Sequence, residues 1–166
     1  MMEMLDDAGE ELKRAEHLIY VSLKYTRTTD VLLNVISRMI EAYEHLIDVL
    51  LMYAQEKLDV EQLPKSPLEK GNLVKKTYSE QEIHDNIDLF FLLRKIYRAP
   101  YEKEQEYRRH VTLISTIDGR EEIINIDVIT QYYEFQKQFF RYIVDKFGSF
   151  AQDKRAEEES EWEKDE

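Results

Sequence analysis

The chain has no cysteine, three prolines and four glycines among its 166 residues. Without cysteine it can form no disulfide bond, no thiol nucleophile and no thiolate metal site. Four glycines are too few for most turns that cradle a cofactor, and the sequence contains no P-loop, no HExxH, no GxSxG and no calcium-binding loop. We therefore expect neither a cofactor nor a metal site.

Long apolar runs are also missing. No stretch approaches the roughly 20 apolar residues that a membrane-spanning helix needs. The opening segment, MMEMLDDAGEELK, is acidic where a secretory signal peptide is basic and then apolar. The absence of cysteine fits a reducing compartment. We expect a cytoplasmic protein that does not bind membranes.

Acidic residues dominate the charge, with 35 Asp and Glu against 23 Lys and Arg, a net charge of −12. Residues 151–166 contribute −5 of this, because eight acidic side chains face three basic ones there. Such acidity disfavours general attraction to nucleic acid, which depends on Lys and Arg displacing counterions from phosphate. Nucleic acid is therefore not an expected partner, although a local contact with RNA stays open.

Four segments carry apolar residues at intervals of three and four, the spacing of one face of an α-helix. They cover about residues 5–27, 30–54, 79–98 and 127–148. The second segment has two adjacent apolar stripes, so it should be the most buried helix. A chain of this length, with 43% hydrophobic residues, can bury the core of one domain, which we place at residues 1–150.

Local signals predict where these helices begin and end. Residues 28–30, Thr-Thr-Asp, indicate a turn and an N-cap. Residues 79–82, Ser-Glu-Gln-Glu, have the pattern of a capping box, and Pro100 should stop that helix. Asp127 is placed to cap the last helix, which is expected to end at Gly148.

Two segments lack clear periodicity. Residues 59–78 contain Pro64, Pro67 and Gly71, and form either a mobile functional loop or a segment with a short helix that the pattern does not locate. Residues 151–166 are expected to be a flexible, acidic tail. Trp162 in that tail is either an anchor for a partner or without a role.

Residues 110–126 favour a β-hairpin, because VTLIST and EEIINI flank Asp118-Gly119, the preferred two-residue turn. That turn would set the register, with the pairs Val111 to Ile126, Leu113 to Ile124 and Ile114 to Ile123. An isolated hairpin is marginally stable, so it should pack on the helices or pair across a dimer. Arg108, Arg109 and His110, just before it, form either a phosphate-binding patch or a charged helix end.

Together these signals predict a mostly α protein: an up-and-down bundle of four to five helices with a β-hairpin before the last helix. The last helix carries an aromatic stripe that includes Tyr132, Tyr133, Phe139, Phe140 and Phe147. A closed twofold contact is the commonest way to cover excess apolar surface, so we expect a homodimer.

One polar stripe runs down the second helix, where residues step by four, three, four and three: Asn34, Arg38, Glu41, His45 and Asp48. It can be a solvated face with ion pairs such as Arg38 to Glu41. Alternatively, Arg38 and His45 project side by side into a groove. An arginine grips phosphate and a histidine exchanges protons, which is a minimal set for metal-free RNA cleavage through the ribose 2′-hydroxyl.

Residues 37–51, SRMIEAYEHLIDVLL, resemble the second helix of HEPN-domain proteins, which commonly has a sequence like SRAYYAAFHAARALL. The matching positions are Ser37, Arg38, Ala42, His45, Leu50 and Leu51. Residues 93–101, LRKIYRAPY, are similar to the segment with an arginine and a tyrosine that begins the later part of that domain. The order of helices also agrees, so the resemblance loosely covers residues 12–147.

The resemblance implies an up-and-down bundle, usually dimeric, found in RNA-cleaving toxins, in nucleotide-binding partners of nucleotidyltransferases and in members without known activity. It also makes Arg94, Arg98 and Tyr101 candidate ligand-binding residues. A nucleotide or another protein is the kind of ligand expected for such a module.

The family's catalytic Arg-x4-6-His motif normally lies late in the domain. After Arg94 or Arg98 the next histidine is His110, which is too far away. Arg38 and His45 fit this spacing but lie on an earlier helix. We therefore expect an HEPN-like interaction or ligand-binding module without catalysis. The alternative is a metal-independent endoribonuclease of the toxin type that uses Arg38 and His45.

Overall fold

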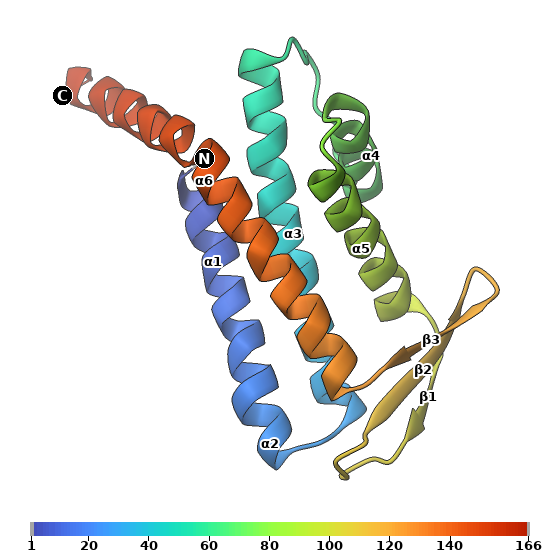
Figure 1. Ribbon diagram of the computed structural model, residues 1–166. Coiled ribbons are helices and arrows are strands. Elements are labelled where there is room, and N and C mark those ends of the chain that lie inside the picture. Colours follow the sequence, from blue (N-terminus) through green and yellow to red (C-terminus); the bar gives the residue numbers. More distant parts are fainter. Residues whose placement is uncertain (1, 166) are drawn as a thin grey trace.

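The computed structural model describes residues 2–165. Its long helices run up and down beside one another, and a small sheet lies at one end of the bundle (Figure 1). The elements are α1 (Met2–His17), η1 (Leu18–Ser22), α2 (Leu23–Tyr25), α3 (Thr29–Lys57), α4 (Pro67–Thr77), α5 (Gln81–Arg98), β1 (Tyr101–Glu104), β2 (Thr112–Ile117), β3 (Arg120–Ile124) and α6 (Ile126–Lys164). The predicted mostly α bundle, with a hairpin before its last helix, is confirmed.

The first predicted helix forms as α1, η1 and α2 in succession and ends at Tyr25, two residues before the expected end. Its middle part, η1, is a π-helical turn, in which each backbone bond spans five residues. Such turns insert one extra residue into a helix and occur often at functional sites. This one lies next to the end of the bundle that carries the sheet.

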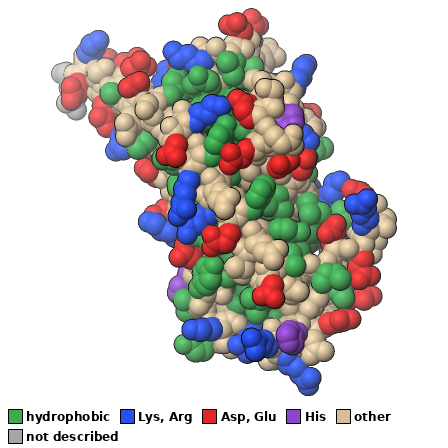
Figure 2. Space-filling view, in the orientation of Figure 1, with side chains coloured by type: hydrophobic (Ala, Val, Ile, Leu, Met, Phe, Trp, Pro, Cys, Tyr) green, Lys and Arg blue, Asp and Glu red, His purple; other side chains and the backbone are tan. Residues whose placement is uncertain are grey.

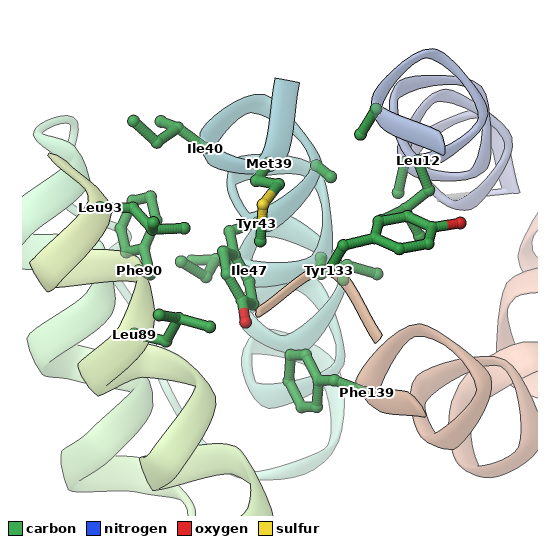
Figure 3. Packing of buried hydrophobic residues seen from close by; sticks show 14 of the residues in the cluster. Leu12, Met39, Ile40, Tyr43, Ile47, Leu89, Phe90, Leu93, Tyr133 and Phe139 are labelled. Carbon is green, nitrogen blue, oxygen red and sulfur yellow. The ribbon is translucent and has the colours of Figure 1, made fainter. Parts of the chain in front are cut away.

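Helix α3 is the centre of the bundle, as its two apolar stripes predict. The hydroxyl of Thr28 accepts a hydrogen bond from the N–H of Val31, which confirms the expected cap. Tyr43 is fully buried, with ring centroids 5.9 Å from Phe90 of α5 and 6.2 Å from Phe139 of α6. Figure 3 shows these rings meeting between the three helices. One continuous core therefore joins helices from both halves of the chain.

Residues 59–78 contain a helix, which confirms one of the two expectations for this segment. Ser66 caps α4 by accepting from the N–H of Glu69, and Pro67 occupies the first turn, where its missing N–H has no cost. Only Gly71 and Val74 of α4 are buried. So small an apolar face leaves no periodic stripe in the sequence.

Helix α5 starts one residue later than the predicted capping box requires. Glu80 is the N-cap residue and makes no side-chain cap bond, so the expectation that Ser79 and Glu82 form a capping box is wrong. The carboxylate of Glu80 instead accepts from Lys146 Nζ of α6, at 2.9 Å. The helix ends at Arg98 before Pro100, as predicted.

The predicted hairpin is β2 and β3, to which β1 adds a third antiparallel strand that the sequence did not indicate. Asp118 and Gly119 both have positive φ, at 52° and 81°, as the tight turn requires. The pairs Leu113 to Ile124 and Ile114 to Ile123 are confirmed. The pair Val111 to Ile126 is wrong, because Ile126 already begins α6.

Helix α6 departs from the prediction at both ends. Its cap is Asn125, whose side chain accepts from the N–H of Val128 at 2.8 Å, and not Asp127. The helix passes through Gly148 and continues to Lys164, because the residues that follow are mostly good helix formers. Ala151 is its last buried residue, and beyond it the helix projects from the bundle (Figure 1).

Across residues 2–165, every helix is too short or too polar to cross a lipid bilayer.

Candidate functional site

Arg38 is held by two carboxylates. Its guanidinium lies 3.3 Å from Glu11 of α1 and 3.4 Å from Glu41, so the predicted ion pair with Glu41 is confirmed. The Glu11 side chain is 8% exposed and also pairs with Arg14 at 2.6 Å. Arg38 therefore links α3 to α1 through an ion pair and neutralises the nearly buried Glu11 carboxylate.

The structure groups Arg38 with residues of α1 rather than with His45. A hollow of about 440 Å³ beside Arg38 is also lined by Lys13, Arg14, His17 and Asn34. His45 is half-buried and is not among the residues that line this hollow. A catalytic role of Arg38 and His45 stays a prediction, and His17 is the histidine that shares the hollow with Arg38.

The candidate ligand-binding residues Arg94, Arg98 and Tyr101 follow one another along the end of α5 and the start of β1. Arg94 lies 3.5 Å from Glu44, and its guanidinium is 5.6 Å from the ring centre of Phe90. Burial raises the pKa of the Glu44 carboxyl, and Arg94 opposes that rise. Arg94 thus has structural partners, Arg98 is exposed, and Tyr101 pairs with β2; a ligand-binding role stays a prediction.

In the described residues 2–165, no three His, Asp or Glu side chains come close enough together to hold a metal ion.

A second group of basic residues meets at the sheet end of the bundle, around a hollow of about 360 Å³. Figure 2 shows Lys, Arg and His side chains gathered at the lower end of the molecule. We call this pocket the basic hollow; its lining is Ile19, Leu23, Lys24, Arg27, Arg109, His110, Thr112, Asn125, Ile126 and Asp127. The lining comes from three segments of the chain: residues 19–27, residues 109–112 and residues 125–127 at the start of α6.

The β1–β2 loop, residues 105–111, positions Arg109 and His110 through contacts with the turn before α3. The N–H of Tyr107 donates to the carbonyl of Arg27 at 2.7 Å. Gln105 and Tyr107 have φ of 56° and 62°, in the left-handed region that costs a non-glycine residue energy. Such conformations persist where surrounding contacts enforce them, so this loop has a defined shape.

The basic hollow carries more basic than acidic side chains. Within residues 2–165, none of its four basic side chains makes a salt bridge, and Asp127 is its single acidic lining residue. A protein of net charge −12 has ample carboxylates for pairing, and many of its other Lys and Arg residues are paired. The start of α6 adds free backbone N–H groups and the positive end of the helix dipole. The hollow can therefore receive an anion.

Two tyrosines that lie within two residues of lining residues in the chain are largely exposed. Tyr25 is 84% exposed and lies between Lys24 and Arg27 in the chain, and Tyr107 is 79% exposed and bonded to the Arg27 carbonyl. Their rings are therefore open to contact with a ligand. An exposed aromatic ring next to basic side chains is a stacking platform for a nucleobase.

The alternative that Arg108 to His110 form a charged helix end is wrong, because these residues form turns. No pattern in the sequence assigns a role to Lys24 or Arg27. The sequence feature that could have indicated this site is the combination of basic residues with Tyr25 and Tyr107 in two short segments. Nothing in the sequence shows that the two segments touch.

No family model, curated protein or solved structure matches this chain significantly.

Proposed function

We propose that the protein is a non-catalytic binding module that holds a nucleotide at the basic hollow. The observation that carries this proposal is the meeting of four unpaired basic side chains in one pocket of a strongly acidic protein, beside two exposed tyrosines. The resemblance to HEPN-domain proteins, some of which bind nucleotides, points in the same direction.

The phosphate groups would bind among Lys24, Arg27 and Arg109. Arginine forms paired hydrogen bonds with phosphate oxygens, and a charge-assisted hydrogen bond contributes about 1.5–3 kcal/mol. A volume of about 360 Å³ is within the usual range of small-ligand pockets. The pocket is open on one side, so the rest of the ligand can extend toward solvent.

The base would stack on Tyr25 or Tyr107. Stacking of a base on an aromatic side chain contributes about 1–3 kcal/mol and requires no particular base. We therefore expect modest discrimination among bases and stronger dependence on the phosphates. Binding should weaken as salt rises, because the basic side chains release counterions from phosphate.

Calorimetric titration at low salt with ATP, AMP and inorganic phosphate tests the proposal. ATP and AMP should bind, and Arg27→Ala or Arg109→Ala should weaken both by about tenfold or more. Tyr25→Ala and Tyr107→Ala should weaken AMP while leaving inorganic phosphate unchanged. Arg120→Ala, which removes an exposed arginine of β3 outside the hollow, is the matched control.

Arg98→Ala distinguishes this site from the one that the sequence predicts. An affinity that falls in Arg98→Ala but not in Arg27→Ala or Arg109→Ala would move the ligand to the end of α5. Absence of any binding of ATP and AMP at millimolar concentration would reject the proposal.

The endoribonuclease alternative has one observation against it: the Arg38 guanidinium is bound to Glu11 and Glu41, and these carboxylates repel phosphate. We expect no cleavage of labelled single-stranded RNA in EDTA. Cleavage lost in both Arg38→Ala and His45→Ala, with both variants folded, would make the nuclease the better assignment. Loss in Arg38→Ala and His17→Ala instead would place the reaction in the hollow that these two residues share.

A further inference from the structure

The projecting end of α6 carries an excess of negative charge. Residues 156–163 contain five glutamates and no Lys or Arg, and they are exposed. Here α6 and the start of α1 enclose a hollow of about 270 Å³. We call this region the acidic end; its hollow is lined by Met2, Glu3, Asp6, Arg155, Glu158, Glu159 and Trp162.

Trp162 gives the acidic end an apolar anchor. It is the one tryptophan of the sequence and is 78% exposed. Tryptophan at a protein surface is typical of contact sites, where its ring supplies much of the binding energy. Its ring also attracts a guanidinium held over its face.

The opposite end of the molecule presents complementary chemistry. In the β1–β2 loop, Arg108, Arg109 and His110 are exposed in succession and make no salt bridge within residues 2–165. The loop has a defined shape, held through Tyr107 and Glu106. A basic loop of fixed shape therefore faces outward at one end, and an acidic hollow with an exposed indole at the other.

The two ends of one molecule cannot meet. Helix α6 has 39 residues and, at about 1.5 Å per residue, spans about 58 Å between them. A second copy of the chain can bring its acidic end to this basic loop, and the charges of the two surfaces are complementary. The other source of a homodimer contact, the aromatic stripe of α6, is used inside the monomer, since Tyr133, Phe139 and Phe147 are buried in its core.

We infer that the acidic end of one copy docks on the basic β1–β2 loop of a second copy. Arg108 and Arg109 would lie against Trp162, Glu158 and Glu159, whose carboxylate also accepts from Arg155 at 3.2 Å. An antiparallel arrangement of two copies would form this contact twice and close the pair into a twofold dimer, whereas a parallel head-to-tail arrangement would leave one end of each surface open. The contact does not depend on nucleotide binding. It does use Arg109, so a nucleotide at the basic hollow competes with it.

Trp162 fluorescence of the full chain tests the contact. In low salt, the emission should shift to shorter wavelength as protein concentration rises, and the sedimentation coefficient should rise in parallel. Added salt should reverse both, because the attraction is between exposed charges. Glu158→Gln/Glu159→Gln and Arg108→Ala/Arg109→Ala should each weaken association by about tenfold, or ~1.4 kcal/mol. Glu61→Gln/Glu121→Gln removes two exposed acidic charges elsewhere and should change nothing.

Mixing the two weakened variants separates a specific contact from general charge effects. The Arg variant still has an intact acidic end and the Glu variant an intact basic loop. One of the two contacts is therefore intact in a mixed dimer, and the mixture should associate more tightly than either variant alone. No association of the mixture, or association that survives in both variants alone, would overturn the inference. The Glu variant should still bind ATP, so loss of docking and loss of nucleotide binding are separate outcomes.

Discussion

The hydroxyl of Thr29 donates to a carboxylate oxygen of Glu106 at 2.6 Å, across 77 residues of sequence. The N–H of Thr29 also points to this carboxylate, at 3.3 Å from each oxygen. Thr29 is the first residue of α3 and is fully buried. This one carboxylate therefore satisfies the start of the central helix and holds the loop that carries Arg109 and His110.

Replacement of Glu106 should lower the stability of the folded protein. Glu106→Ala leaves a buried hydroxyl and an N–H without their partner, which costs about 1–3 kcal/mol of unfolding free energy. Urea denaturation measures this loss. Glu104→Ala, two residues earlier in exposed β1, is the control and should change stability by less than ~0.5 kcal/mol. Equal stability of the two variants would show that the loop is held by other contacts.

Two of the helical glycines, Gly71 and Gly148, should respond in opposite directions to alanine. A Cβ on Gly71 would lie 2.6 Å from the ring of Phe91, so Gly71→Ala must push that ring away from α4. We expect a loss of about 1 kcal/mol or more. A Cβ on Gly148 meets only Val144, at 3.9 Å, so Gly148→Ala should raise stability by about 0.5–1 kcal/mol through helix propensity. Thermal unfolding of both variants decides between these signs.

Glu80 gives stability a defined dependence on pH. Its hydrogen bond from Lys146 lowers the pKa of the Glu80 carboxyl below its ordinary value of 4.5. A lowered pKa in the folded state means that the bond stabilises above pH 4.5 and is lost as the pH falls through the lowered value. Glu80→Gln should therefore be less stable than the natural protein at pH 7, by less than ~1 kcal/mol because the pair is half-exposed.

The difference between these two proteins should vanish at low pH, where the natural carboxyl is neutral as well. Denaturation midpoints between pH 7 and pH 3 provide the measurement. Glu121→Gln, at an exposed position of β3 that makes no salt bridge within residues 2–165, should show no such closing gap. A difference that persists at the lowest pH would mean that charge is not its cause.

Patterns that act over a few residues were sufficient for much of the fold. The apolar spacing of α3, the stop before Pro100 and the turn at Asp118-Gly119 each depend on local backbone geometry. The register of β2 with β3 followed from that turn, and four of the five larger helices were recognised. The register failed at Ile126 because Asn125 caps the helix there and ends the strand pairing.

Other features depend on partners that are distant in the chain. Strand β1, with sequence YEKE, has little strand character of its own and forms because β2 offers an edge to pair with. Helix α4 has a small apolar face and is stabilised where Gly71 meets Phe91. Gly148 permits a helix end but does not require one, and α6 continues past it. Beyond Gly148, an ion pair between Lys154 and Glu56 links α6 to α3.

Some features of the candidate site follow from local sequence patterns, and others depend on residues that are distant in the chain. By itself the sequence determined that the chain is acidic, mostly helical and without cysteine, and that Arg38 and Glu41 share a helix face at ion-pairing distance. Only the tertiary structure determines that Glu11 forms an ion pair with Arg38. It also determines that Lys24 and Arg27 line the same pocket as Arg109 and His110. The reason is physical: helix spacing acts between neighbours in the chain, whereas a pocket arises where packing brings together segments about eighty residues apart, and no local pattern records that meeting.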